Sequence, residues 1–386
     1  MTVCDLTHAH HPTSGGIRTF IDLKRRYLLE HTDHAHVLIA PGERDAVERG
    51  DRWTTVRVRS PLLPGGSTYR FFTRPGAVRA ALAETQPDVV ELNTYYAPTE
   101  ARPAFAYRRA RRSVRTPTLV GVHYHTDFAD SYVAAYTGPA SGALTPLARR
   151  YVRRILRRAD TVMTLAPMFA EQLAGYGVDG VELVPQFVDL ERFHPRHADP
   201  AVRARYGVAD GGLMLAYLGR FDSEKHVDTL VAMVDALPAE LRPTLVMAGA
   251  GPDRERLGAE AARNPRLVVS EYLDKDGVAG LLASADVYVT AGPHEVAAFS
   301  VVEAQAAGLP VVGVAAGGLL DRVHDGLGYL VPVDDHAAMA DAVARAFADR
   351  EAMSARVRAY VEEHYSWRRC FAQVVGAYER QLPAGL

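Results

Sequence analysis

The chain has 386 residues, of which 48% are hydrophobic and 23% are charged, with a formal net charge of −2 at pH 7. This composition excludes a disordered chain, and 386 residues exceed what one hydrophobic core usually organises, so two domains are expected. The longest apolar runs, Leu213–Leu218 and Val296–Val302, are far shorter than the roughly 20 residues of a membrane-spanning helix.

The cysteines and the N-terminal stretch indicate the compartment. Cys4 and Cys370 lie far apart in the sequence, which favours a reducing environment over a disulfide framework. The N-terminal stretch lacks the basic segment of a signal peptide, so a cytoplasmic location is expected. Residues 1–190 carry a net charge of +5 and the remainder −7. Neither half is basic enough to predict a nucleic-acid partner.

Short apolar segments alternate with helical patterns along the whole chain. In the first half, strands are expected at Val3–Thr7, Val37–Ala40, Thr55–Val58, Val89–Leu92, Leu119–Tyr124, Val162–Leu165 and Glu182–Val184. In the second half, they are expected at Met214–Leu218, Thr244–Ala248, Leu267–Val269, Val287–Thr290, Val311–Val314 and Tyr329–Val331. Apolar strands separated by helices predict parallel sheets covered on both faces, so the expected fold class is α/β with two Rossmann-like domains.

The boundary between the two series is expected near Val184–Pro195, where two prolines bracket a segment of weak periodicity. The predicted domains are residues 1–190 and 191–365. A last helix, at about 366–386, would be free to pack back on the first domain.

Two glycine turns follow expected strands at their carboxyl ends, where open parallel sheets bind ligands. Gly15 and Gly16 precede a helix, and such a turn lets the backbone approach an anion, although a plain turn fits equally well. The turn Gly249–Pro252 has only part of a dinucleotide-binding glycine pattern. It therefore indicates a tight strand–helix turn and disfavours a nicotinamide dehydrogenase.

Arg220 and Lys225 lie in one loop after the first strand of the second half, and Lys225 is one of only three lysines beside 41 arginines. A planar guanidinium and a compact ammonium together suit a diphosphate. The alternative is a solvated pair that Asp222 and Glu224 neutralise.

His123 and His125 flank Tyr124 at the end of a strand, so an extended backbone puts both imidazoles on one face. Either they are polar core residues or they contact a ligand. Two histidines with no third ligand at a suitable spacing do not make a metal site, so no metal is expected.

Glu295 and Glu303 lie eight positions apart, on either side of an expected helix start. Ser300 and Glu303 fit a capping box, which by itself is a sufficient structural reason for Glu303. Glu295 lies before the helix in a Gly/Pro loop and has no comparable structural reason.

Taken together, these segments resemble the family-4 retaining glycosyltransferases along essentially the whole chain. The segments that carry the resemblance are the Gly-Gly loop, Tyr124–Phe128, Val184–Pro195, Tyr217–Val231, Val246–Asp253, Ala283–Glu295, Ser300–Val312 and Gly328–Asp335. The most diagnostic motif is the pair Glu295 and Glu303. The resemblance implies the GT-B fold: two facing Rossmann-like domains with parallel sheets and an inter-domain cleft. The segments around His125 and Glu295 look most like those of bacterial mannosyltransferase-type members.

The resemblance also implies roles for individual residues. Arg220 and Lys225 would bind the donor diphosphate and stabilise the charge on the leaving nucleotide. His125 and Glu295 would contact the transferred sugar. Glu303 would accept hydrogen bonds from ribose hydroxyls. The other implied donor-binding residues are Gly15, Gly16, Gly249, Tyr272, Phe299 and Ser300. No cofactor and no metal are implied.

One pair of residues departs from the family pattern. Ala297 and Ala298 stand where members commonly have an aromatic residue and then a glycine. The loop's approach to the sugar is therefore expected to differ, and the identity of the hexose stays open.

Six arginines mark one side of the expected helix 147–160. They are Arg149, Arg150, Arg153, Arg154, Arg157 and Arg158. The spacing leaves Leu147, Tyr151, Ile155 and Leu156 for the other side. The arginines either meet anionic lipid headgroups, with the protein peripheral to the inner membrane face, or form a solvated face.

The expected activity is a retaining transfer of a hexose from a nucleoside-diphosphate sugar to an unidentified hydroxyl acceptor. The alternatives are a nucleotide-sugar epimerase of the same fold and a non-catalytic sugar-nucleotide-binding protein. The residues do not define the donor base, the acceptor or the oligomeric state.

Overall fold

The computed structural model describes residues 1–11, 16–62, 69–111, 117–133, 137, 140–165, 167–271, 273–295, 298–324 and 326–382. The chain forms two compact units, Met1–Val184 with Arg368–Leu386, and Pro185–Trp367. The chain thus changes unit at the start of the proline-bracketed segment, and its C-terminal helix belongs mainly to the first unit.

The first unit contains an eight-stranded sheet in the order β3-β4-β2-β1-β5-β6-β7-β8. Its strands are β1 (Thr2–Leu6), β2 (Ala35–Gly42), β3 (Ala46–Arg49), β4 (Trp53–Arg59), β5 (Val89–Leu92), β6 (Leu119–His123), β7 (Thr161–Thr164) and β8 (Glu182–Leu183). All neighbouring strands in this sheet are parallel except β3 and β4.

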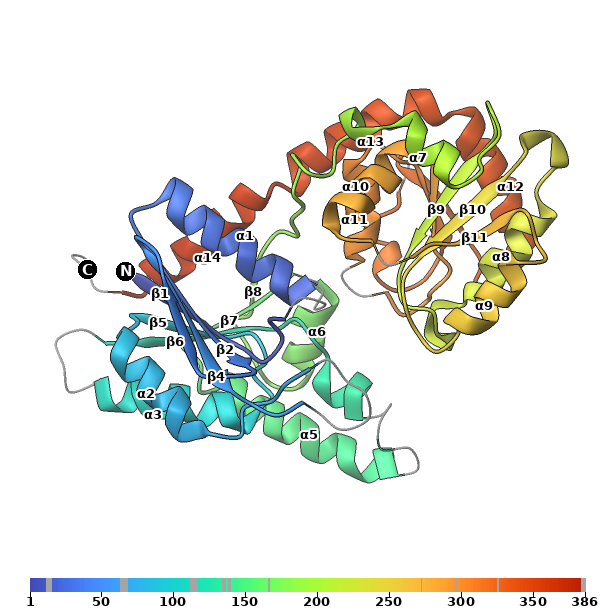
Figure 1. The fold of residues 1–386 in the computed structure, drawn as a ribbon. Coiled ribbons are helices and arrows are strands. Elements are labelled where there is room, and N and C mark those ends of the chain that lie inside the picture. Colours follow the sequence, from blue (N-terminus) through green and yellow to red (C-terminus); the bar gives the residue numbers. More distant parts are fainter. Residues whose placement is uncertain are drawn as a thin grey trace. The chain divides into compact units, whose positions relative to one another are not determined.

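Helices cover both faces of this sheet. They are α1 (Gly16–His31), α2 (Pro75–Thr85), α3 (Pro98–Arg111), the π-helical turn Phe128–Tyr132, α5 (Ser141–Leu156), α6 (Pro167–Gly175) and α14 (Trp367–Glu379). Figure 1 shows α1 and α14 on one face and α2 and α3 on the other. A Cβ at Gly121 in β6 would lie 2.9 Å from the Tyr378 hydroxyl, so α14 packs closely on the sheet.

The second unit contains a six-stranded parallel sheet in the order β11-β10-β9-β12-β13-β14. Its strands are β9 (Met214–Leu218), β10 (Thr244–Ala248), β11 (Leu267–Val269), β12 (Val287–Val289), β13 (Val311–Val314) and β14 (Gly328–Val331). Its helices are α7 (Pro200–Arg205), α8 (Val227–Ala236), α9 (Arg254–Ala261), α10 (Lys275–Ser284), α11 (Phe299–Ala306), α12 (His336–Ala348) and α13 (Arg350–His364), with 3₁₀ turns at Pro195–His197, Ser223–Lys225, Ala239–Leu241 and Gly317–Leu319.

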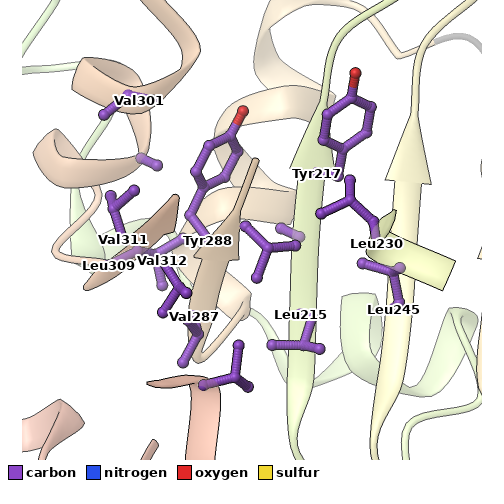
Figure 2. Close-up of a cluster of buried hydrophobic side chains, with 14 of the residues drawn as sticks. Leu215, Tyr217, Leu230, Leu245, Val287, Tyr288, Val301, Leu309, Val311 and Val312 are labelled. Atoms are coloured by element: carbon purple, nitrogen blue, oxygen red, sulfur yellow. The ribbon is translucent and has the colours of Figure 1, made fainter. Parts of the chain in front are cut away.

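The core of the second unit explains its continuous apolar strands. Every residue of β12 and β13 is buried, because helices cover both faces of the sheet. Figure 2 shows Leu215, Leu245, Val287 and Val312 in this core, with the phenol rings of Tyr217 and Tyr288 extending toward the arrow ends of their strands.

The expected α/β class with two parallel sheets is confirmed, and the expected strands lie within two residues of those observed. The strand that the sequence analysis missed is β3, with the sequence AVER. It is an edge strand whose residues are largely exposed, and it pairs antiparallel with β4. An exposed edge strand lacks the apolar run by which the other strands are recognised.

Candidate active site

Three loops meet at the carboxyl edge of the second sheet, because β10, β9 and β12 are neighbours there. They follow β9 (Gly219–Lys225), β10 (Gly249–Pro252) and β12 (Thr290–Glu295). This edge is where open parallel sheets bind ligands.

Glycines bring the first two loops into backbone contact. A Cβ at Gly249 would lie 1.8 Å from the Gly219 carbonyl oxygen, and one at Gly251 would lie 2.3 Å from the Phe221 carbonyl oxygen. The Phe221 N–H also donates to the Ala250 carbonyl at 2.9 Å. The glycine turn therefore supports the loop that carries Arg220 and Lys225.

Lys225 and Glu295 form an ion pair between the first and third loops. The Lys225 Nζ donates to Glu295 Oε1 at 2.6 Å, and each side chain is only 17% exposed. Gly292 lets the loops approach, since a Cβ there would lie 3.2 Å from the Lys225 Cδ. The ion pair therefore places the positive charge of Lys225 beside Glu295, the residue that is expected to contact the transferred sugar.

The backbone of Glu295 is held by a turn after β13. The Gly318 N–H donates to the Glu295 carbonyl oxygen at 2.6 Å. Gly317 has a φ of +55°, and a Cβ there would lie 2.6 Å from the same oxygen. Only glycine fits this contact at this φ, so Glu295 is anchored in place by its main chain.

Arg220 has different partners from Lys225. Its guanidinium contacts Asp222 at 3.0 Å and Glu224 at 2.6 Å, and the side chain is 64% exposed. The neutralised, solvated arrangement considered for this pair thus describes Arg220 but not Lys225. The Arg220 main chain is fixed, because the Tyr217 hydroxyl donates to its carbonyl oxygen at 2.9 Å.

The expected capping box at Ser300 and Glu303 is wrong. The helix α11 begins at Phe299, its N-cap is Ala298, and no side chain caps it. Ser300 therefore lies within the first turn, near the Tyr288 hydroxyl. Phe299 packs its ring on Phe187 at a centroid distance of 5.6 Å. The structural reason offered for Glu303 therefore disappears.

Glu303 has an unusual environment for a carboxylate. The structure gives it no hydrogen-bond donor among the described residues, and Lys275 and Arg192 are the cations whose charges act on it. Burial raises the pKa of Glu303 to about 7, although both cations oppose the shift. An acid of raised pKa that lacks donors is ready to accept hydrogen bonds from a ligand.

Ala298 adopts a backbone conformation that favours glycine. Its φ and ψ are 45° and 47°, in the left-handed region, and its side chain is buried. This is the position at which family members commonly have glycine. The backbone therefore keeps the glycine-type conformation even though the residue has changed.

In the first unit, His125 lies just after β6 and is partly exposed. Its Nε2 lies 2.9 Å from the Asn93 Oδ1. Gly16 is the first residue of α1. The predicted residues Gly15 and Tyr272, and Ala297 of the unusual loop, lie outside the described residues.

His123 has the character of a core residue. It is fully buried, its ring stacks on His125 at 4.3 Å and packs on Phe20 at 4.3 Å. Neither ring nitrogen has a hydrogen-bond partner within the described part of the chain. Burial holds the pKa of His123 well below its ordinary value, so the ring is neutral.

The sequence analysis did not identify Asn93, the hydrogen-bond partner of His125. It follows β5, in which Glu91 is a charged residue within an apolar strand. Asp5 in β1 is a second such residue. A charged residue within an otherwise apolar, buried strand is unusual, and this sequence signal could have identified Asp5, Glu91 and the neighbouring Asn93 as a group of buried polar residues.

The arginines of α5 are all exposed, and Arg149 pairs with Asp130 at 2.7 Å. The assignment of Leu147 to the packed side is wrong, because this residue is 62% exposed and Leu144 is 39% exposed. Ile155 and Leu156 are buried as expected, together with Val152. No helix within the described ranges is long and apolar enough to cross a membrane.

Two α/β units, each built on a largely parallel sheet with loops at the carboxyl ends of its strands, are typical of the GT-B class of glycosyltransferase folds. The structure resembles sucrose-phosphate synthase from Thermosynechococcus elongatus, with a TM-score of 0.78 and 20% identity over 98% of both chains. It also resembles Anabaena HepE in complex with UDP, with a TM-score of 0.73 and 15% identity over 98% of this chain and 100% of that one. At these identities the likeness concerns the fold.

Sequence comparisons give the family. Residues 14–192 match the model for glycosyltransferase family 4, and residues 199–364 match that for glycosyl transferases group 1. A GDP-mannose-dependent alpha-mannosyltransferase of Mycobacterium tuberculosis is 32% identical over 369 residues, covering 91% of this chain and 90% of that protein. The GDP-mannose-dependent alpha-(1-6)-phosphatidylinositol dimannoside mannosyltransferase of the same species is 31% identical over 325 residues, covering 81% and 79%.

The chain belongs to glycosyltransferase family 4. The expected family, fold class and retaining glycosyltransferase activity are therefore confirmed.

Proposed function

We propose that this glycosyltransferase transfers mannose from GDP-mannose to a hydroxyl acceptor. The ion pair between Lys225 and Glu295 is the observation that carries the proposal, because it holds a cation suited to a diphosphate beside a carboxylate suited to sugar hydroxyls, at the end of the sheet where parallel strands bind ligands. The choice of donor is supported by the relatives that are named for GDP-mannose.

The proposed donor lies along the loops of the second unit. Lys225 and Arg220 bind its diphosphate, so each cation exchanges a carboxylate for a phosphate oxygen. Glu303 accepts hydrogen bonds from the ribose, which would supply the donors that its carboxylate lacks. Glu295, released from Lys225, accepts from a hydroxyl of the mannose.

Transfer on the same face of the sugar retains its configuration. The bond between C1 and the β-phosphate oxygen breaks while the acceptor oxygen attacks C1 from the side that the phosphate leaves. The acceptor proton passes to the leaving phosphate oxygen, so GDP is released and no external base is needed. The cations stabilise the charge that develops on this phosphate, and we propose that no metal ion takes part.

A panel of ligands tests the donor. Ligand binding to the native state raises the midpoint of thermal unfolding. GDP and GDP-mannose should raise it more than the uridine, adenosine and cytidine diphosphates and their sugars, each at the same concentration. A larger shift with a uridine nucleotide would overturn the choice of donor.

A turnover assay tests the reaction. Incubation of GDP-mannose with bacterial lipid and glycan extracts should release GDP and add one hexose mass to an acceptor, at the same rate with or without EDTA. Conversion of GDP-mannose without any acceptor would instead indicate an epimerase. Binding with no conversion in any extract would indicate a non-catalytic protein, and loss of the rate in EDTA would contradict the metal-free mechanism.

We also propose that the exposed side of α5 contacts an anionic membrane surface. Leu147 lies seven positions before Arg154, so the two exposed side chains share one stripe of α5. Exposed leucine beside exposed arginine is typical of helices that lie at a lipid interface. An acceptor with a lipid anchor would then be reached at that surface.

A further inference from the structure

Lys24 forms a fully buried ionic cluster in the first unit. Its Nζ donates to Asp5 Oδ1 at 2.6 Å and to Glu91 Oε1 at 2.7 Å. All three side chains are 0% exposed. They come from α1, β1 and β5 and so join three elements. Burying charges in this way is unfavourable unless each is paired, and it contributes little to stability compared with an apolar core.

A hydrogen-bond chain connects this cluster with His125. The Asn93 Nδ2 donates to Asp5 Oδ1 at 2.7 Å, and the Asn93 Oδ1 lies 2.9 Å from the His125 Nε2. The Asp5 carboxylate can only accept, so it determines which end of the Asn93 amide faces it. The amide oxygen then faces His125 and requires the proton on Nε2.

The other contacts of Asp5 fix its carboxylate. The His36 Nε2 lies 2.7 Å from Asp5 Oδ2, and the Arg25 Nε donates to the His36 Nδ1 at 2.8 Å. His36 Nδ1 is therefore an acceptor, and His36 donates its Nε2 proton to Asp5. Both oxygens of Asp5 are thus bonded, and these contacts hold the carboxylate where it accepts from Asn93.

We propose that Lys24, Asp5 and Asn93 are positioning residues that hold His125 as the neutral tautomer with its proton on Nε2. The Nδ1 atom is then a hydrogen-bond acceptor for a hydroxyl of the donor sugar. This inference rests on the proposed contact between His125 and the sugar.

The protonation states agree with this geometry. Burial, with a smaller contribution from Lys24, lowers the pKa of His125 to about 3, so its ring is neutral. Burial alone would raise the pKa of Asp5, but Lys24 and His36 hold it below its ordinary value. Burial likewise opposes the charge on Lys24, and Asp5 and Glu91 nevertheless raise its pKa.

Side-chain ¹⁵N NMR of the histidines tests the inference directly, with Asn93→Ala as the probe and His125→Gln to assign the signals. In the wild type, His125 should show one tautomer protonated at Nε2. In Asn93→Ala, this signal should change to a mixture of both tautomers. An unchanged His125 tautomer in Asn93→Ala would overturn the inference.

Tyr378→Phe is the matched control. The Tyr378 hydroxyl donates to Glu91, so its removal disturbs the same buried cluster without touching the bonds to Asn93. Stability should fall in both variants, but the tautomer and kcat should change only in Asn93→Ala. A tautomer change of equal size in Tyr378→Phe would show a general loosening of the core and contradict positioning.

Kinetics separate this inference from the proposed function. In Asn93→Ala, kcat should fall about tenfold or more with little change in donor affinity, as for other residues that orient a functional histidine. If His125→Gln keeps full activity, the sugar contact fails while the tautomer result stands. If His125→Gln is inactive but Asn93→Ala is fully active, the contact stands and the positioning role fails.

Discussion

At the scale of single residues, Arg220 and Lys225, the two cations proposed to bind the diphosphate, differ in how firmly they are held. Arg220 lies at the surface between Asp222 and Glu224, whereas Lys225 is largely buried against Glu295. A largely buried ammonium acts where the local dielectric is low, so its charge has a stronger effect on a phosphate. Lys225 should therefore carry more of the catalytic effect.

Replacing this lysine tests that ranking. Lys225→Ala should lower kcat by about 10²–10³-fold, the effect of removing one preorganised charge-stabilising group. The circular dichroism spectrum should not change. Arg256→Ala, which removes an exposed cation paired with Asp228, is the control and should keep full turnover. A Lys225→Ala enzyme within about twofold of wild type would reject the diphosphate assignment.

Glu303 gives donor binding a pH dependence. In the proposed site the ionised carboxylate accepts the hydrogen bonds of the ribose, whereas the protonated acid keeps only part of its acceptor capacity, and burial raises the pKa of Glu303 to about 7. The affinity for GDP-mannose should thus fall as the pH drops below about 7, approaching tenfold per pH unit. Calorimetric titration between pH 5.5 and 8 measures this. Glu303→Gln should bind more weakly at high pH and lose the dependence; an unchanged affinity would remove Glu303 from the site.

The same raised pKa fixes the sign of a stability effect. The folded state binds a proton that the unfolded state has already lost, so the contribution of Glu303 to stability is present below the unfolded pKa and is lost as the pH rises through about 7. Glu303→Gln should therefore be more stable than wild type at pH 8 but not at pH 4.

Ala298 carries backbone strain at the edge of the site. A left-handed conformation costs a non-glycine residue about 1–2 kcal/mol. Glycine avoids this cost, but part of the gain in stability is lost because glycine has a higher conformational entropy in the unfolded chain. Ala298→Gly should increase the free energy of unfolding by about 1 kcal/mol in urea titrations. Ala304→Gly, within α11, should decrease it by at least about 1 kcal/mol. Destabilisation by both would show that Ala298 is not strained.

At the scale of the elements, short apolar runs were enough to predict the parallel strands, because most of the residues in these strands are buried. The predicted start of α11 was wrong. The N-cap is Ala298, two residues before Ser300, and the capping pattern at Ser300 gives no sign of the positive φ at Ala298. The Lys24 cluster could not be predicted, since Asp5, Glu91 and Asn93 are brought together only by the strand order β1-β5. Long-range polar contacts of this kind leave no local pattern.

Helix α5 offers a test of its own at this scale. If its exposed stripe meets lipid, Leu147→Ser and Arg154→Glu should each weaken co-sedimentation with phosphatidylglycerol-containing vesicles, and neither should affect vesicles of phosphatidylcholine alone. Arg26→Glu, an exposed arginine on α1, is the control for the change of charge. Equal binding of all variants to the vesicles would contradict the lipid contact and would show that the arginines of α5 form a solvated face.

At the scale of the whole molecule, the residues proposed to contact the donor are distributed over both compact units. The diphosphate and ribose contacts are assigned to Pro185–Trp367, whereas His125 belongs to Met1–Val184. A ligand that lacks the sugar should thus affect one unit, and a complete donor should affect both. The proposal for His125 can be tested without knowing the acceptor.

Hydrogen exchange measured by mass spectrometry makes this test. GDP should protect the segments 219–226 and 298–303, because the loop and the helix start lose opening freedom when the nucleotide binds. GDP-mannose should protect the same segments and, in addition, 123–128 around His125. Residues 159–162 lie at the amino end of β7, away from the carboxyl ends of the strands where His125 lies, and serve as the internal control. They should exchange equally in all states. Protection confined to the second unit with both ligands would place the sugar away from His125 and reject its assigned contact.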